Sequence, residues 1–320
     1  MDVLGDFQLT SVSGRITEHA LRGAVDFAAA PTQMRSLLGP LALLPGTWKG
    51  RGFNQIWRPF HGSQDRFLEL NETIETLEFE EIPGDIPNRG LLQADVNLHG
   101  VRYLQQIQDA HVLGPNGKLA GIHIEPGLWL STPETTDPQD PPTVARLANI
   151  PHGTSLVAQG TGAPRNGGPE IQPVSITPFV IGDPNNKIPF PETDLSAPSQ
   201  FRTPPGDIPN VTQAMVDNPN IVLTNAIAGH NIISTTILRV STTPLNPPTS
   251  GGGTSNIAFL KGTGDGPNAD VVQVEAIFWL EIVREPNGAI KHQLQYTQTV
   301  LLNFNGLSWP HVTVATLEKH

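Results

Sequence analysis

Glycine and proline interrupt this chain throughout, with 31 of each among its 320 residues. Proline inside a helix removes a backbone hydrogen bond, and glycine costs conformational entropy there, so long helices are disfavoured. Turn residues between short β-type runs instead predict strands joined by many turns. The length would permit two average domains, but β-barrels often run to about 200–250 residues as one unit, so length alone does not fix the domain count.

Charge and cysteine content exclude several classes of protein. The net charge is −11, and no block of Lys or Arg exceeds a pair, which argues against nucleic acid or an anionic membrane as partner. Cysteine is absent, so disulfides and thiolate ligation of a metal are excluded. The N-terminal residues lack the basic and apolar regions of a signal peptide, and no apolar run reaches membrane-spanning length. We therefore expect a cytoplasmic protein.

Strand signals dominate the chain after residue 46. Apolar residues alternate with the others from 272 to 282, which is the clearest strand pattern. Residues 290–304 follow across Glu-Pro-Asn-Gly, and the last strand begins after Asn305-Gly306. A hairpin is predicted over 101–130, with its turn at 114–117, and another strand pair over 143–160. The sequence thus predicts a mostly antiparallel, all-β fold.

Two segments stand apart from this strand pattern. Helical spacing is confined to residues 16–38, so we expect an N-terminal helical cap over 1–40. Residues 161–255 are rich in Pro, Gly and Asn, which predicts a long insertion, although strand character returns at 228–240. We expect a single barrel domain over 41–319, with this insertion inside it.

Several segments resemble the nitrobindins, small haem-binding barrels of the calycin superfamily related to fatty-acid-binding proteins. LPGTWKGRG at 44–52 resembles their opening strand, and GIHIEPGLW at 121–129 resembles their His-x-Glu-x-Gly-aromatic motif. The segments at 72–79, 103–110, 146–160 and 294–319 follow in the order found in that family. The resemblance covers about half of the chain and implies an up-and-down, calycin-like barrel of about ten strands, enlarged by insertions. Where the family has a Tyr-Pro-Thr segment after its first strand glycines, this chain reads FNQIWRPF, so the cavity entrance should differ.

The resemblance also implies a ligand and a set of site residues. His311 stands where the family supplies the axial ligand of haem b iron, and His123 stands on the opposite, distal side, where it would act in catalysis. The structural alternatives are that His311 is a histidine at a strand start, hydrogen-bonded at the barrel rim, and that His123 pairs with Glu125. Arg58, Arg102 and Arg239 are candidates for pairing with haem propionates. The expected cofactor-binding residues are His311, Ile122, His123, Tyr103, Tyr296, Val300 and Thr313, with His311 as the metal ligand.

Two functions follow from this interpretation. The first is a haem b protein that handles nitric oxide, peroxynitrite or peroxide, with peroxynitrite isomerase-like or peroxidase-like activity left open. The alternative is a non-catalytic carrier of a lipid or another apolar small molecule in the barrel cavity. In both cases the partner is a small molecule in the cavity, and a homodimer remains open as the assembly.

Overall fold

A computed structural model describes residues 37–62 and 65–320. Residues Leu38–His320 form one compact unit. The predicted helical cap over 1–40 lies almost entirely outside the described residues. The described chain enters the barrel through a short 3-10 helix, η1 (Gly39–Leu41), whose Leu41 is buried.

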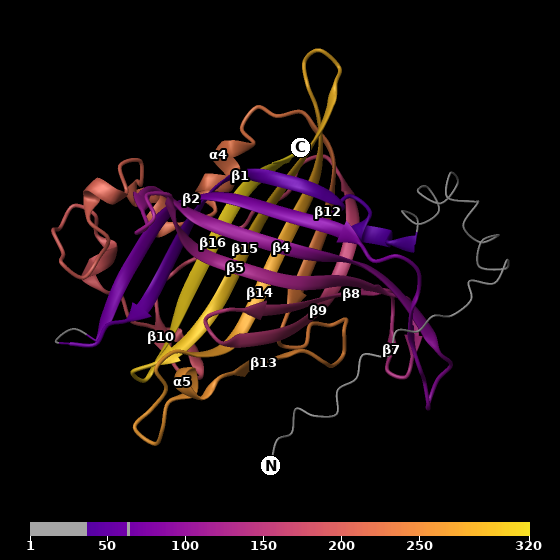
Figure 1. The fold of residues 1–320 in the computed structure, drawn as a ribbon, viewed down its shortest axis with the longest axis horizontal. Coiled ribbons are helices and arrows are strands. Elements are labelled where there is room, and N and C mark those ends of the chain that lie inside the picture. The colour runs from indigo at the N-terminus through magenta and orange to yellow at the C-terminus, as the bar shows by residue number, and fades with distance from the viewer. Residues whose placement is uncertain (1–36, 63–64) are drawn as a thin grey trace. The chain divides into compact units, whose positions relative to one another are not determined.

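Ten long strands of the described residues close into an antiparallel barrel (Figure 1). Each strand pairs with the next barrel strand along the chain, and the last strand pairs with the first, so the barrel has up-and-down order. The strands are β1 (Gly46–Pro59), β2 (Arg66–Glu81), β4 (Val96–Leu113), β5 (Leu119–Thr132), β8 (Thr143–Ile150), β9 (Thr154–Asn166), β12 (Ile232–Ser241), β14 (Asp270–Arg284), β15 (Ile290–Phe304) and β16 (Leu307–Lys319). The all-β prediction and the closed, antiparallel, ten-strand barrel are confirmed.

Shorter elements decorate the barrel. The minor strands are β3 (Ile86–Asn88), β6 (Thr135–Thr136), β7 (Gln139–Asp140), β10 (Phe179–Val180), β11 (Asp183–Lys187) and β13 (Gly253–Asn256). The remaining helices are η2 (Pro191–Thr193), η3 (Pro205–Asp207), α3 (Gln213–Asp217), α4 (Ile221–Ala226) and α5 (Ala258–Lys261). The expected insertion at 161–255 is wrong at two places, because residues 161–166 belong to barrel strand β9 and residues 232–241 form barrel strand β12. Two loops remain, one before and one after β12.

Glycines allow the first and last strands to close the barrel. A Cβ placed on Gly50 would lie 2.0 Å from the backbone oxygen of Thr316, and one on Gly52 would lie 2.2 Å from that of Val314. Real Cβ atoms do not approach a carbonyl oxygen so closely. Gly50 and Gly52 are thus required by the close contact between β1 and β16.

The insertion between β9 and β12 packs on the outside of the barrel. Alternation places Ile56 on the inner face of β1 and its neighbours Gln55 and Trp57 on the outer face. The Gln55 amide nitrogen donates to the Met215 carbonyl at 2.5 Å, and Trp57 Nε1 donates to the Ile176 carbonyl at 3.0 Å. Both outward side chains are fully buried. The insertion therefore covers the barrel wall and does not fill the interior.

Candidate functional site

The interior of the barrel contains a cavity of about 320 Å³. Side chains of nine strands line it, together with the turn after β8 and α5. The surface of the cavity is mainly apolar, and its larger aliphatic side chains are Ile56, Ile107, Ile122, Ile150, Leu260, Val271, Val300 and Leu302. The volume and the apolar wall are typical of a small-molecule site.

Six of the seven residues that the sequence predicted as binding residues line this cavity. They are His311, His123, Ile122, Tyr296, Val300 and Thr313. Tyr103 does not line it; the phenol is buried behind the lining and hydrogen-bonds Glu125 and Arg146. Five of the six come together because alternating positions on antiparallel strands share one face, here the interior of the barrel. Ile122 is the extra residue at an irregularity in the pairing of β4 with β5, which directs it toward the cavity as well.

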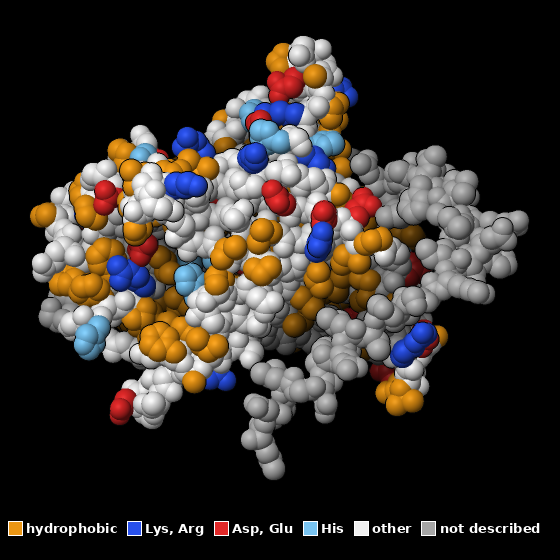
Figure 2. Space-filling model, in the orientation of Figure 1, with side chains coloured by type: hydrophobic (Ala, Val, Ile, Leu, Met, Phe, Trp, Pro, Cys, Tyr) orange, Lys and Arg blue, Asp and Glu red, His pale blue; other side chains and the backbone are white. Residues whose placement is uncertain are grey.

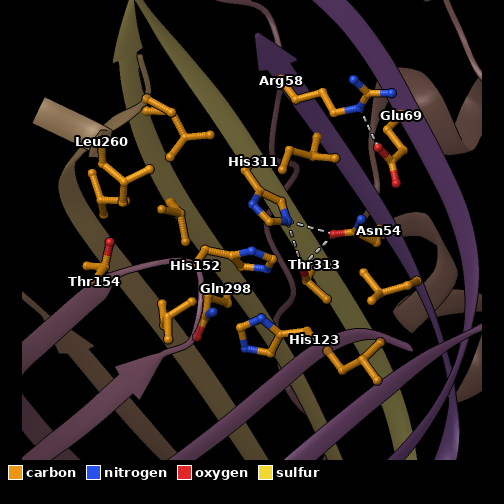
Figure 3. Close-up of a pocket in the computed structure, with 18 of the residues that line it drawn as sticks. Asn54, Arg58, Glu69, His123, His152, Thr154, Leu260, Gln298, His311 and Thr313 are labelled. Atoms are coloured by element: carbon orange, nitrogen blue, oxygen red, sulfur yellow. Dashed lines mark hydrogen bonds and ion pairs between the residues drawn. The ribbon is translucent and has the colours of Figure 1, made fainter. Parts of the chain in front are cut away.

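His311 is held by a hydrogen bond to the neighbouring strand, β1. Its Nε2 lies 2.7 Å from Asn54 Oδ1 on β1, and the Thr313 hydroxyl donates to the same oxygen at 2.9 Å (Figure 3). Burial lowers the pKa of His311 to about 3, and the nearby imidazoles of His123 and His152 add to this effect. The His311 ring is therefore neutral at physiological pH and carries one lone pair.

His123 hydrogen-bonds the glutamate of a buried ion pair, Glu125–Arg146. Its Nε2 lies 3.2 Å from Glu125 Oε2, and the other carboxylate oxygen accepts from Arg146 at 2.5 Å. Burial alone would raise the pKa of Glu125, but the charge of Arg146, followed by His123, outweighs it and holds that pKa well below its usual range. Arg146 also donates to Tyr103 and Gln298. The pairing of His123 with Glu125, the structural alternative considered from the sequence, is present.

A second buried carboxyl lies beneath Tyr296. The Tyr296 hydroxyl donates to Glu75 at 2.6 Å and accepts from Gln105 at 2.9 Å. Burial raises the pKa of Glu75 to about 7, against the hydrogen bonds from Tyr296 and Thr73, which lower it. Gln105, Tyr296 and Gln298 also line the cavity, so this polar layer forms part of its wall.

Sequence reasoning missed His152 and the contribution of α5. His152 lies in the turn between β8 and β9, and its ring centroid is 6.1 Å from that of His123. Figure 3 shows His152 between His311 and His123 in that view, with Leu260 of α5 on the opposite side of the space. The turn Pro-His-Gly directly follows an alternating strand, which is the signal that could have placed His152 at the barrel end. The contribution of Leu260, distant in sequence, had no such signal.

Charged groups around the cavity are few. Among the described residues that line it, Arg58 is the one cation, and it forms an ion pair with Glu69 at 2.6 Å. Arg102 and Arg239 do not line the cavity and pair with Glu80 and Glu275. Within residues 37–62 and 65–320, no three His, Asp or Glu side chains are grouped closely enough to hold a bare metal ion.

Surface features and sequence comparisons add little to this site. Figure 2 shows basic and acidic side chains interspersed over one face of the molecule. No helix in the described part of the chain is long and apolar enough to cross a membrane. The sequence matches no protein-family model and no curated protein.

Proposed function

We propose that this barrel binds haem b in its cavity, with His311 as the protein ligand to the iron. The observation that carries the proposal is a neutral, cavity-lining imidazole in a pocket whose surface is mainly apolar. A bare metal ion needs several protein ligands, and the described residues do not group them. Haem iron brings four nitrogen ligands of its own and needs a single axial group from the protein.

The residues present fit this group in two respects. A metal-bound histidine nearly always donates its other ring N–H to an oxygen acceptor, and Asn54 supplies such an acceptor for His311. The apolar part of the wall suits a porphyrin face. When bound, haem would supply an iron centre for nitric oxide, peroxynitrite or peroxide. His123, held by Glu125, would then offer a polar contact to the small molecule.

Titration with hemin tests the proposal. The wild-type protein should develop a Soret band. His311→Ala should weaken haem binding by more than about 100-fold, because removing a metal ligand costs more than removing a residue that only hydrogen-bonds the ligand. His111→Ala is the matched control, because His111 pairs with Glu72 and does not line the cavity. Equal haem affinity in wild type and His311→Ala would refute the ligand assignment.

A second candidate is a carrier of a neutral apolar molecule. Two observations favour this function: the apolar wall, and polar groups around the cavity that already hydrogen-bond other protein groups. Arg146 is fully buried and already bound to Glu125, and Arg58 is paired with Glu69, so neither cation is left to bind a carboxylate. Native mass spectrometry of the purified protein separates the two candidates, because a haem adduct and a smaller neutral adduct differ in mass.

A further inference from the structure

A row of buried amides leads from His311 to a carboxylate on the far side of two strands. Asn54 Nδ2 donates to Asn71 Oδ1 at 3.0 Å, and Asn71 Nδ2 donates to Asp109 Oδ2 at 2.8 Å. The other oxygen of Asp109 accepts the backbone N–H groups of His111 and Val112, each at 2.8 Å. Asn54, Asn71 and Asp109 are 3%, 6% and 4% exposed, so water competes little for these bonds.

The carboxylate fixes the direction of every bond in this row. A carboxylate oxygen accepts hydrogen bonds, so Asn71 turns its NH₂ group toward Asp109 and its oxygen toward Asn54. Asn54 must then turn its NH₂ group toward Asn71 and its oxygen toward His311. The Thr313 hydroxyl donates to that same oxygen, as this orientation requires. His311 Nε2 therefore has to carry the hydrogen.

From this geometry we infer that Asp109, acting through Asn71 and Asn54, sets the tautomer of His311 and leaves Nδ1 as the lone-pair nitrogen offered to the cavity ligand. The tautomer follows from the hydrogen bonds alone, whereas the role of Nδ1 in binding rests on the proposed function. No described residue hydrogen-bonds Nδ1, and His311 is partly exposed on the cavity lining. Asp109 is a positioning residue, since it touches neither the cavity nor its ligand.

This assignment narrows the chemical class of the ligand. A lone pair attracts a Lewis-acidic metal centre or a hydroxyl or N–H donor, and it repels a carboxylate. The cavity should thus select a metalloporphyrin or a neutral hydrogen-bond donor over a fatty-acid anion.

Nitrogen-15 NMR of the histidine-labelled apoprotein tests the tautomer without any ligand. In the wild type, Nε2 of His311 should show the shift of a protonated ring nitrogen and Nδ1 that of an unprotonated one, with the signal assigned by its loss in His311→Phe. In Asp109→Asn, the new Oδ1 still accepts both backbone N–H groups, and the new Nδ2 can donate to Asn71. The whole row can then reverse, and the Nδ1–H tautomer of His311 should appear. Hemin affinity should fall by about 10-fold or more in the same variant.

Asp140→Asn is the matched control, because Asp140 is a buried carboxylate that accepts from Thr249 and takes no part in the row. It should leave the His311 signals unchanged. An Nδ1–H tautomer in the wild type would overturn the inference even if Asp109→Asn failed to fold, and so would an unchanged tautomer in folded Asp109→Asn. Wild-type protein that shows the Nε2–H tautomer but binds no haem would refute the proposed function and leave the tautomer assignment intact.

Discussion

Two buried glutamates in the barrel interior have opposite protonation behaviour. Glu125 is paired with Arg146 and stays ionised, whereas Glu75 meets only neutral donors and keeps its proton until about pH 7. Carboxyls whose environments separate their pKa values in this way are common where proton transfer or ligand binding occurs, although structural networks also produce them. Both carboxyls lie directly behind cavity-lining residues, His123 and Tyr296.

The raised pKa of Glu75 predicts a specific pH dependence of stability. Between pH 4.5 and about 7 the folded protein retains a proton that the unfolded chain loses, so the stabilisation is full below pH 4.5 and is lost as the pH rises through about 7. At about 1.36 kcal/mol per pKa unit, the Glu75 contribution is roughly 3 kcal/mol at most. Glu281, whose pKa burial also raises to about 7, acts in the same window.

Urea unfolding at several pH values measures this contribution. Glu75→Gln, a neutral mimic of the protonated acid, should remove Glu75's share of the fall in unfolding free energy between pH 4.5 and 8. Glu78→Gln, an exposed change on the same strand, should leave the wild-type slope. An unaltered slope in Glu75→Gln would show that Glu75 is ionised in the folded protein.

At the scale of elements, the sequence predicted the strands far better than their surroundings. The hairpin over 101–130 corresponds to β4 and β5, and the alternating run at 272–282 lies within β14. Local alternation and turn residues encode these strands, and alternation also brought His311 and Thr313 to the interior. His152 and the Asn54–Asn71–Asp109 row were missed because they depend on which strands become neighbours. The pairing register of the strands creates these contacts, and no local sequence pattern predicts that register.

Closure between β1 and β16 gives a prediction about an element. A methyl group on Gly50 would overlap the Thr316 carbonyl, so Gly50→Ala has to push the two strands apart. We expect a loss of unfolding free energy of at least about 1–3 kcal/mol, the usual cost of overpacking. Hydrogen exchange should become faster mainly in β1 and β16.

Gly121→Ala is the control for this prediction, because Gly121 is also a strand glycine but has no atom within 4 Å of the added Cβ. It should unfold at nearly the wild-type urea concentration. If Gly50→Ala were as stable as Gly121→Ala, the close approach of β1 and β16 would not be what requires glycine at position 50.

At the scale of the whole molecule, the barrel and the outer insertion are separable in principle. The insertion leaves and re-enters the barrel at one place, since Asn166 of β9 is paired with Ser234 of β12 and Gly167 hydrogen-bonds Ile233. None of the described residues between 155 and 259 lines the cavity. The insertion's contacts are instead with the outer wall, where Phe53 and Trp57 are fully buried.

Replacing residues 168–232 with Asn-Gly should therefore keep the cavity while uncovering the wall. Asn-Gly suits a two-residue hairpin turn, which the paired ends of β9 and β12 can accept. The exposed Phe53 and Trp57 should make this variant self-associate, and adding Phe53→Thr and Trp57→Thr should restore a monodisperse protein, as measured by size-exclusion chromatography with light scattering. The hemin affinity of that protein should stay within about 10-fold of the wild-type value. Removing even one residue that hydrogen-bonds a metal ligand commonly lowers metal affinity by more than this. A folded variant that had lost hemin binding would mean that the insertion shapes the cavity through the strands it covers, because it contributes no lining residue itself.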